Sequence, residues 1–333
     1  MRTEWTGRVV RCGIASVLSL FLASAPGTAA VADALPAAKI SAAGLLWSPG
    51  RLAVDGAMTL SVVDSYRDRI QQFDRSGRQL VTIAVTRPSA IAAAPDGTLY
   101  IGSLQDRSVS RYRHGKRAGS LGDGRNEFAS IGDIAVDPGT GDIYVVDTVK
   151  HLVKVYYPSG IPKGMLSGLH LPVGIAVTPD AVYVLDAPVV AAAGSTGATT
   201  GSRISVYSKG GNLLRSIDDR GAAGGQMARP MGIAVDRAGT VYVADALRKA
   251  VLVYSRSGAF IGRMESAAND INTAVAIVLT PDNRLYVSSS ETHGIVEIGL
   301  GGTVYAGPAD ALAFISGTGE RLTHAALAGG TER

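Results

Sequence analysis

The chain has 333 residues, of which 46% are hydrophobic and 18% charged, so it is long enough for one large β domain or two ordinary ones. Its 41 glycines suit many tight turns between short strands. The formal net charge of +4 is too small for the basic footprint of a nucleic-acid-binding protein, and we exclude nucleic acid as a partner.

Residues 1–32 are predicted to be a secretory signal peptide. They combine a basic start, an apolar run over 13–23 and small residues that suit cleavage after Ala30 or Ala32. The alternative is a retained membrane anchor, but the apolar run is shorter than the ~20 residues that a spanning helix needs. No other segment is apolar enough to span a membrane. The sequence therefore predicts a periplasmic or extracellular protein with no membrane span after cleavage.

The single cysteine, Cys12, lies inside this leader. The mature chain is therefore expected to fold without disulfides, held together by its core. Removal of the three arginines and one glutamate of the leader leaves a formal net charge of +2.

A strand-like unit recurs along the rest of the chain. Its first strand has an apolar-Ala-Val core or a close variant, often after a proline. The six copies of this core begin at Leu52, Ile91, Ile134, Ile175, Ile233 and Ile277. Spacing near forty residues, with short strands in each unit, is typical of the blades of a β-propeller.

A second and a third strand follow in the same register in each copy. The second strand is predicted to end at Asp64, Ser103, Asp147, Asp186, Asp245 and Ser289. The third is predicted to begin at Arg69, Ser108, Leu152, Ala250 and Gly294, and at Arg203 in copy four, which carries an insertion. Several offsets held together across six copies favour an all-β, six-bladed propeller.

The repeat resembles the NHL family. The resemblance rests on Pro-Met-Gly-Ile-Ala-Val-Asp at 230–236, on Tyr-Val-Ala-Asp at 242–245 and on Lys150-His151-Leu152. It covers roughly residues 45–300 and implies six four-stranded antiparallel blades around a central channel. Copies two and six depart from the pattern, because Ser103 and Ser289 replace the usual Asp.

These features divide the chain into the leader 1–32, a propeller over 38–306 and a flexible tail over 307–333. A low-complexity insertion at 187–202 interrupts blade four. It is either a lid over the channel mouth or a tolerated surface loop. The segment 38–46 is expected to close the ring as an outer strand of the last blade, because an open sheet edge must be covered.

The mouth of the channel is the predicted binding site, because the loops that enter the first strands meet there. The candidate binding residues are Arg51, Ser89, Asp133, His170 and Met231. Arg51 and Asp133 are the charged residues at the position just before the first strand's core. They form either a ligand-binding pair or a pair without a ligand, through a mutual ion pair or exposure to solvent, since an unpaired charge is costly at a crowded axis.

No metal or cofactor site is predicted. The repeated aspartates at the ends of the second strands are expected to cap loops through backbone N–H groups. His151 and His293 occupy a variable loop position that Asp68, Arg107 and Lys249 fill in other copies, which does not suit a ligand shell.

The resemblance also suggests two classes of propeller enzyme as alternatives. Amidating lyases on NHL propellers hold zinc with histidines just before the first strands, but the matching positions here are Gly50, Ser89, Gly132, Val173, Met231 and Val275. Lactonase-type propellers use acidic and Asn ligands at the channel, where only Asp133, and Asn272 more distantly, could contribute.

The sequence was therefore interpreted as an exported, non-catalytic scaffold that binds another envelope or extracellular protein, a peptide or a glycan. The sequence favours a protein without enzymatic activity over an enzyme. The alternative was a metal-dependent lyase or lactonase-type propeller enzyme, with no catalytic residue assigned.

Overall fold

The computed structural model describes residues 38–40, 46–187, 201–218, 225–265, 271, 273–300, 313–315 and 321–323. The predicted leader lies outside the described residues, as do residues 188–200 of the insertion and most of the tail. The predicted domain boundaries there stay predictions. Within the described residues, no helix has the length and apolar character to cross a membrane.

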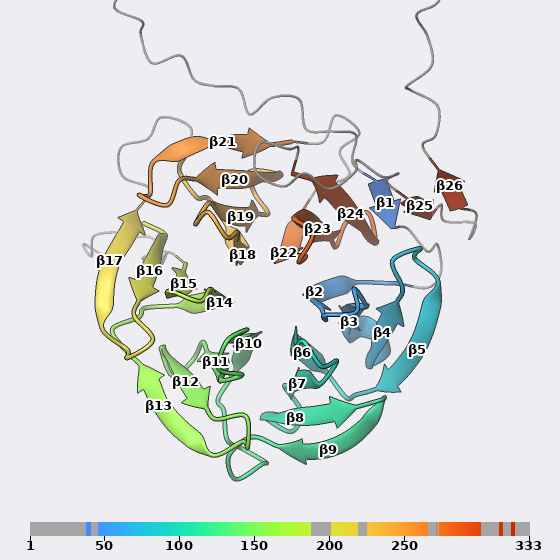
Figure 1. Ribbon diagram of the computed structural model, residues 1–333, viewed down its shortest axis with the longest axis horizontal. Helices are drawn as coiled ribbons and strands as arrows, with labels where there is room; N and C mark the ends of the chain where they lie inside the picture. The colour runs from blue at the N-terminus through green and yellow to red at the C-terminus, as the bar shows by residue number, and fades with distance from the viewer. Residues whose placement is uncertain are drawn as a thin grey trace, which may run out of the picture.

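Six antiparallel sheets stand in a ring around a central channel, as the sequence predicts (Figure 1). Each contributes one strand to the channel and stacks the others outward. Blades one and two are β2 (Pro49–Val54), β3 (Leu60–Asp64), β4 (Arg69–Phe73), β5 (Gln79–Ala84), and β6 (Pro88–Ala93), β7 (Leu99–Ser103), β8 (Ser108–Arg113), β9 (Lys116–Ser120). Blades three and four are β10 (Ile131–Val136), β11 (Ile143–Asp147), β12 (Leu152–Tyr156), β13 (Pro162–Leu166), and β14 (Pro172–Val177), β15 (Val182–Asp186), β16 (Arg203–Tyr207), β17 (Leu213–Asp218).

Blade five is β18 (Pro230–Val235), β19 (Val241–Asp245), β20 (Ala250–Tyr254) and β21 (Phe260–Met264). Blade six has β22 (Ala274–Leu279), β23 (Arg284–Ser289) and β24 (Gly294–Gly299), and β1 (Ala38–Ile40) pairs antiparallel with β24 as its fourth strand. An N-terminal strand thus completes the last sheet, as expected for ring closure. β25 (Ala313–Ile315) and β26 (Arg321–Thr323) extend the same sheet, which the sequence did not predict.

The second strand of each blade is almost entirely buried. All five residues of β3, β7, β11, β15 and β19 are buried. These strands lie between two others of their own sheet and between two neighbouring blades, so both faces are covered. This explains why they read as continuous apolar runs such as Ile-Tyr-Val-Val in place of an alternating pattern.

The hydrophobic core is divided among the gaps between blades. Among the described residues there are six clusters, and each joins two adjacent blades. The cluster between blades six and one packs Leu52, Val62 and Phe73 against Tyr286 and Ile295. Because every gap is filled, the ring is closed by side-chain packing as well as by the strand from the N-terminal side.

The aspartates at the ends of the second strands bind loop backbone, which confirms their predicted role. Asp147 accepts hydrogen bonds from the N–H groups of Ala129 and Ser130, which precede the inner strand of the same blade. It also accepts one from Lys150 in the following loop. The carboxylate therefore fixes two loops at the channel mouth relative to each other.

Candidate functional site

The mouth of the channel is built by an irregularity that recurs in every inner strand. Strand pairing skips a residue close to the start of the inner strand in all six blades. The residues that share this position are Gly50, Ser89, Gly132, Val173, Met231 and Val275. Such bulges free backbone groups from the ladder and re-aim side chains. Here they supply a ring of groups around the channel.

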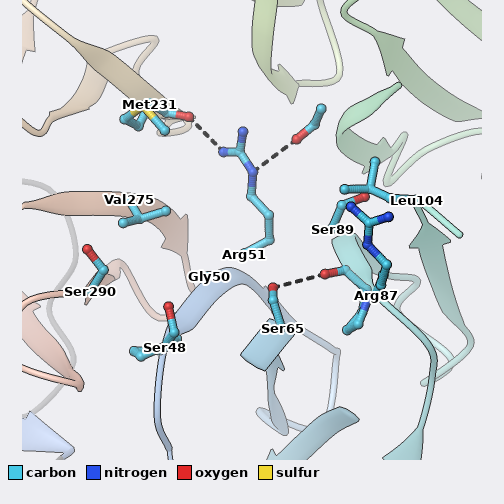
Figure 2. A pocket seen from close by; sticks show the side chains of 13 residues that line it. Ser48, Gly50, Arg51, Ser65, Arg87, Ser89, Leu104, Met231, Val275 and Ser290 are labelled. Atoms are coloured by element: carbon cyan, nitrogen blue, oxygen red, sulfur yellow. Dashed lines mark hydrogen bonds between the residues drawn. The ribbon is translucent and has the colours of Figure 1, made fainter. Parts of the chain in front are cut away.

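Arg51 crosses the channel from blade one and binds three of these backbone carbonyls. Its Nε donates to the oxygen of Gly132 at 3.1 Å and its Nη1 to that of Met231 at 2.8 Å. Its Nη2 donates to the oxygen of Val173. The guanidinium thus links blade one to blades three, four and five. Figure 2 shows its bond to Met231 on blade five. It satisfies carbonyls that would otherwise face the axis without a partner.

Asp133 holds this guanidinium from blade three. Its Oδ2 lies 3.5 Å from Arg51 Nη1, and the two side chains are only 11% and 12% exposed. The carboxylate also accepts hydrogen bonds from the N–H groups of Ile134 and Ile175. Burial raises the pKa of Asp133, although Arg51 and the two N–H groups act in the opposite direction. Of the two arrangements considered from the sequence, the structure has the mutual ion pair.

A cavity of about 440 Å³ opens around Arg51 at the mouth. This is within the range of small-molecule sites, roughly 300–1,000 Å³. Its lining is drawn from the inner-strand bulges and from the loops beside them (Figure 2): Ser48, Pro49, Gly50, Arg51, Ser65, Arg87, Pro88, Ser89, Leu104, Gly132, Met231, Val275 and Ser290. Blades one, two, three, five and six all contribute, so the site exists only in the closed ring.

The structure brings together most of the predicted mouth residues. Arg51, Ser89 and Met231 line the cavity, and Asp133 contacts Arg51. His170 does not join them. Its Nδ1 lies 3.4 Å from Asp186 Oδ2 and 2.9 Å from Arg203 Nη2. His170 therefore belongs to the loop that the Asp186 carboxylate binds at the end of blade four's second strand.

Arg87 is a cavity residue that the sequence reasoning missed. It stands in the loop between β5 and β6, immediately before the proline that begins the inner strand of blade two. The predicted mouth comprises the two positions just before each strand core, whereas Arg87 lies further upstream. The signal that marks it is its place directly before Pro88, as Ser48 stands directly before Pro49.

The cavity does not suit a metal ion of the kind that lactonase-type propellers hold. Among the described residues there is no group of three or more His, Cys, Asp or Glu side chains that could bind one. The described lining supplies no carboxylate, imidazole or amide, and the Arg51 guanidinium occupies the ring of carbonyls where a cation would be attracted. The other suggested ligand, Asn272, lies outside the described residues. We therefore derive no catalytic step through a metal.

The fold and the site define a six-bladed β-propeller with a small-molecule cavity at one mouth of its channel. Residues 44–291 match the SMP-30/gluconolactonase/LRE-like region. The chain belongs to this family. No curated protein sequence matches it significantly.

Solved structures of similar fold have varied activities. XC5397 from Xanthomonas campestris, a gluconolactonase, has a TM-score of 0.62 at 17% identity, over 81% of this chain and 96% of its own. A streptogramin B lyase has a TM-score of 0.55 at 10% identity, over 80% and 97%. The Kuenenia stuttgartiensis hydrazine synthase has 0.54 at 13%, over 77% and 96%. At these identities the likeness concerns the fold, which does not by itself fix a reaction.

The family match corrects the functional interpretation of the sequence. A non-catalytic scaffold without enzymatic activity was the preferred reading, and it is wrong by this finding, which favours the lactonase-type alternative. The repeat motifs carried no catalytic signal because they specify strands and turns. The family match extends over residues 44–291, and no short motif within them is specific enough to indicate the family.

Proposed function

We propose that the protein is a lactonase-type hydrolase that opens a small cyclic ester in the cavity at the channel mouth. The observation that supports this most is the coincidence of the family match with a cavity of substrate size around Arg51. The cavity is lined on one part by Pro49, Leu104 and Val275, which suits the carbon skeleton of a small ring.

Arg51 is the residue proposed to stabilise the transition state. A guanidinium has five N–H groups. Three of those of Arg51 are used on backbone carbonyls and Nη1 also faces Asp133, so one N–H of Nη2 remains for the substrate. Water attacks the ester carbon, and the carbonyl oxygen gains negative charge that this N–H group stabilises. The ring C–O bond then breaks, and its oxygen leaves as an alcohol while the acyl part becomes a carboxylic acid.

Asp133 is proposed to act through Arg51. Its ion pair and the three carbonyls hold the guanidinium in one orientation before the substrate arrives. Fixed donors of this kind are worth more than mobile ones, because they need no reorganisation during the reaction.

A panel of five- and six-membered lactones, followed by acid release, tests this function. We expect hydrolysis faster than in buffer, and a loss of about 10²-fold in kcat/KM for Arg51→Lys, which keeps the charge but loses the forked donors. Circular dichroism establishes that the variant is folded. Arg107→Ala, an arginine of blade two that does not line the cavity, is the matched control and should hydrolyse at the wild-type rate. If no lactone in the panel is opened faster than in buffer, the proposal is wrong.

A further inference from the structure

We propose that the channel mouth is a carboxylate-binding site, so that the molecule it takes carries a carboxylate. The inference deepens the proposed function by naming a substrate class, but it rests on contacts of the cavity that can be tested without turnover.

The charge of the cavity is the first observation. Its described lining contains two ionisable side chains, and both are arginines. The charge of Arg51 is matched by Asp133. Among the described residues Arg87 makes no ion pair and no side-chain hydrogen bond, and it is exposed. The mouth therefore presents one uncompensated guanidinium, which attracts an anion and repels a cation.

The backbone of Arg87 is held while its guanidinium is not. Its N–H donates to Asp68 Oδ1 at 2.7 Å, and its carbonyl accepts from the N–H of Leu104 at 3.0 Å. Its φ of 45° lies in the left-handed region, which costs a residue with a side chain about 1 kcal/mol or more in a folded chain. Asp68 is thus engaged with the main chain of Arg87. The main chain of Arg87 is therefore fixed at the edge of the cavity while its side chain is exposed.

Ser89 supplies an independent observation. Its hydroxyl oxygen is buried in the cavity wall and has no hydrogen-bond partner within the part of the chain that the structure describes. It sits on the bulge of blade two, two residues after Arg87 (Figure 2). A buried hydroxyl without a partner is uncommon and calls for a ligand or a water. Because Ser89 and Arg87 line the same cavity, the Ser89 hydroxyl can donate to a carboxylate that the Arg87 guanidinium also binds.

The described lining of the cavity thus offers donors and contains no carboxylate. Arg87 can bind a carboxylate with two parallel N–H donors, and Ser89 can add a third. The apolar part of the wall, including Leu104 and Val275, remains for the rest of the molecule. An amphipathic small acid fits this arrangement, whereas a divalent metal ion does not.

Calorimetric titration with acetate, benzoate and mandelate, each against its neutral amide, tests the site. We expect at least one acid to bind about tenfold or more tightly than its amide. Arg87→Ala should lose about tenfold in affinity for that acid, and Ser89→Ala about threefold. Arg107→Ala is the control, because Arg107 also has a left-handed backbone (φ 48°) on blade two but lies outside the cavity lining; it should bind as the wild type does.

Several results would overturn the inference. They are equal binding of every acid and its amide, unchanged affinity in a folded Arg87→Ala variant, or calcium binding that the acids compete with. Tighter binding of inorganic phosphate than of any acid would assign the site to phosphoryl groups instead. The two proposals fail separately. Acid binding that depends on Arg87, without hydrolysis of any lactone, would support the carboxylate site and contradict the proposed hydrolase. Lactone hydrolysis with an unchanged KM in Arg87→Ala would support the hydrolase and contradict the carboxylate site.

Discussion

Replacement of Arg51 by methionine is expected to lower the free energy of unfolding by about 3–5 kcal/mol, the usual cost of removing one partner of a buried ion pair. Three backbone carbonyls on blades three, four and five lose their donor, and Asp133 loses its counter-charge. For a domain of this size the melting temperature should fall by about 10 °C. Denaturant unfolding and thermal melts measure both quantities.

The same variant should be sensitive to pH. Burial raises the pKa of Asp133 and Arg51 opposes it, so the pKa rises further when Arg51 is removed. A carboxyl group whose folded-state pKa lies above its unfolded value loses stability as the pH rises from the unfolded pKa towards the folded pKa. The difference in melting temperature should therefore widen as the pH rises above the folded-state pKa that Asp133 has in the wild type.

Arg256→Met is the control for this experiment. Arg256 pairs with Asp180 at 3.4 Å, but both side chains are more than half exposed. Loss of such a pair changes stability by about 1 kcal/mol at most. If the melting temperature of Arg51→Met equals that of Arg256→Met, the Arg51 guanidinium does not stabilise the ring of carbonyls at the channel mouth.

Replacement of Asp245 by alanine is the second large effect that we expect. The carboxylate is fully buried and accepts hydrogen bonds from the N–H groups of Ala228, Arg229, Leu247 and Arg248. Removal leaves these donors without their acceptor, and a hydrogen bond to a charged group contributes about 1.5–3 kcal/mol. We expect at least about 3 kcal/mol of lost stability, with faster amide hydrogen exchange in the two loops that it joins.

Asp245→Ser is the matched variant, because Ser103 and Ser289 occupy the equivalent position in blades two and six. The Ser103 hydroxyl donates to the carbonyl of Thr86 and accepts from the N–H of Asp106. A serine at position 245 should therefore keep some of the hydrogen bonds between the two loops. Its cost should lie between those of wild type and alanine. Unchanged exchange in both loops of Asp245→Ala would show that the carboxylate is not needed there.

The strand register could be predicted because it repeats. The second strands end at the residues that the sequence indicated, Asp64 and Asp245 among them, and the third strands begin where predicted, for example at Arg69 and Ala250. Six copies of one pattern average out local ambiguity, and the apolar runs mark strands covered on both faces.

The contacts of Arg51 at the channel mouth could not be predicted from the sequence. Arg51 binds carbonyls of residues 81, 122 and 180 positions away, and a carbonyl contact leaves no mark on the partner's residue type. The pairing of Arg51 with Asp133 was one of two alternatives from the sequence, and closure of the ring decided between them.

The loop between the second and third strands shows the same limit. Asp68, Arg107, His151, Lys249 and His293 share its last position, and all have φ between 48° and 57°. Asp and His enter this region more readily than most residues, but Arg and Lys do not, so the residue types alone do not predict the shared left-handed conformation. The tight connection between two paired strands imposes this conformation on whichever residue is present.

The metal content of the purified protein tests most directly the claim that this mouth is built around a guanidinium. Elemental analysis of protein prepared without chelator should find calcium and zinc far below one equivalent per chain, and lactone hydrolysis should survive dialysis against a chelator. One tightly bound divalent cation per chain, whose removal abolishes hydrolysis and whose return restores it, would contradict the account.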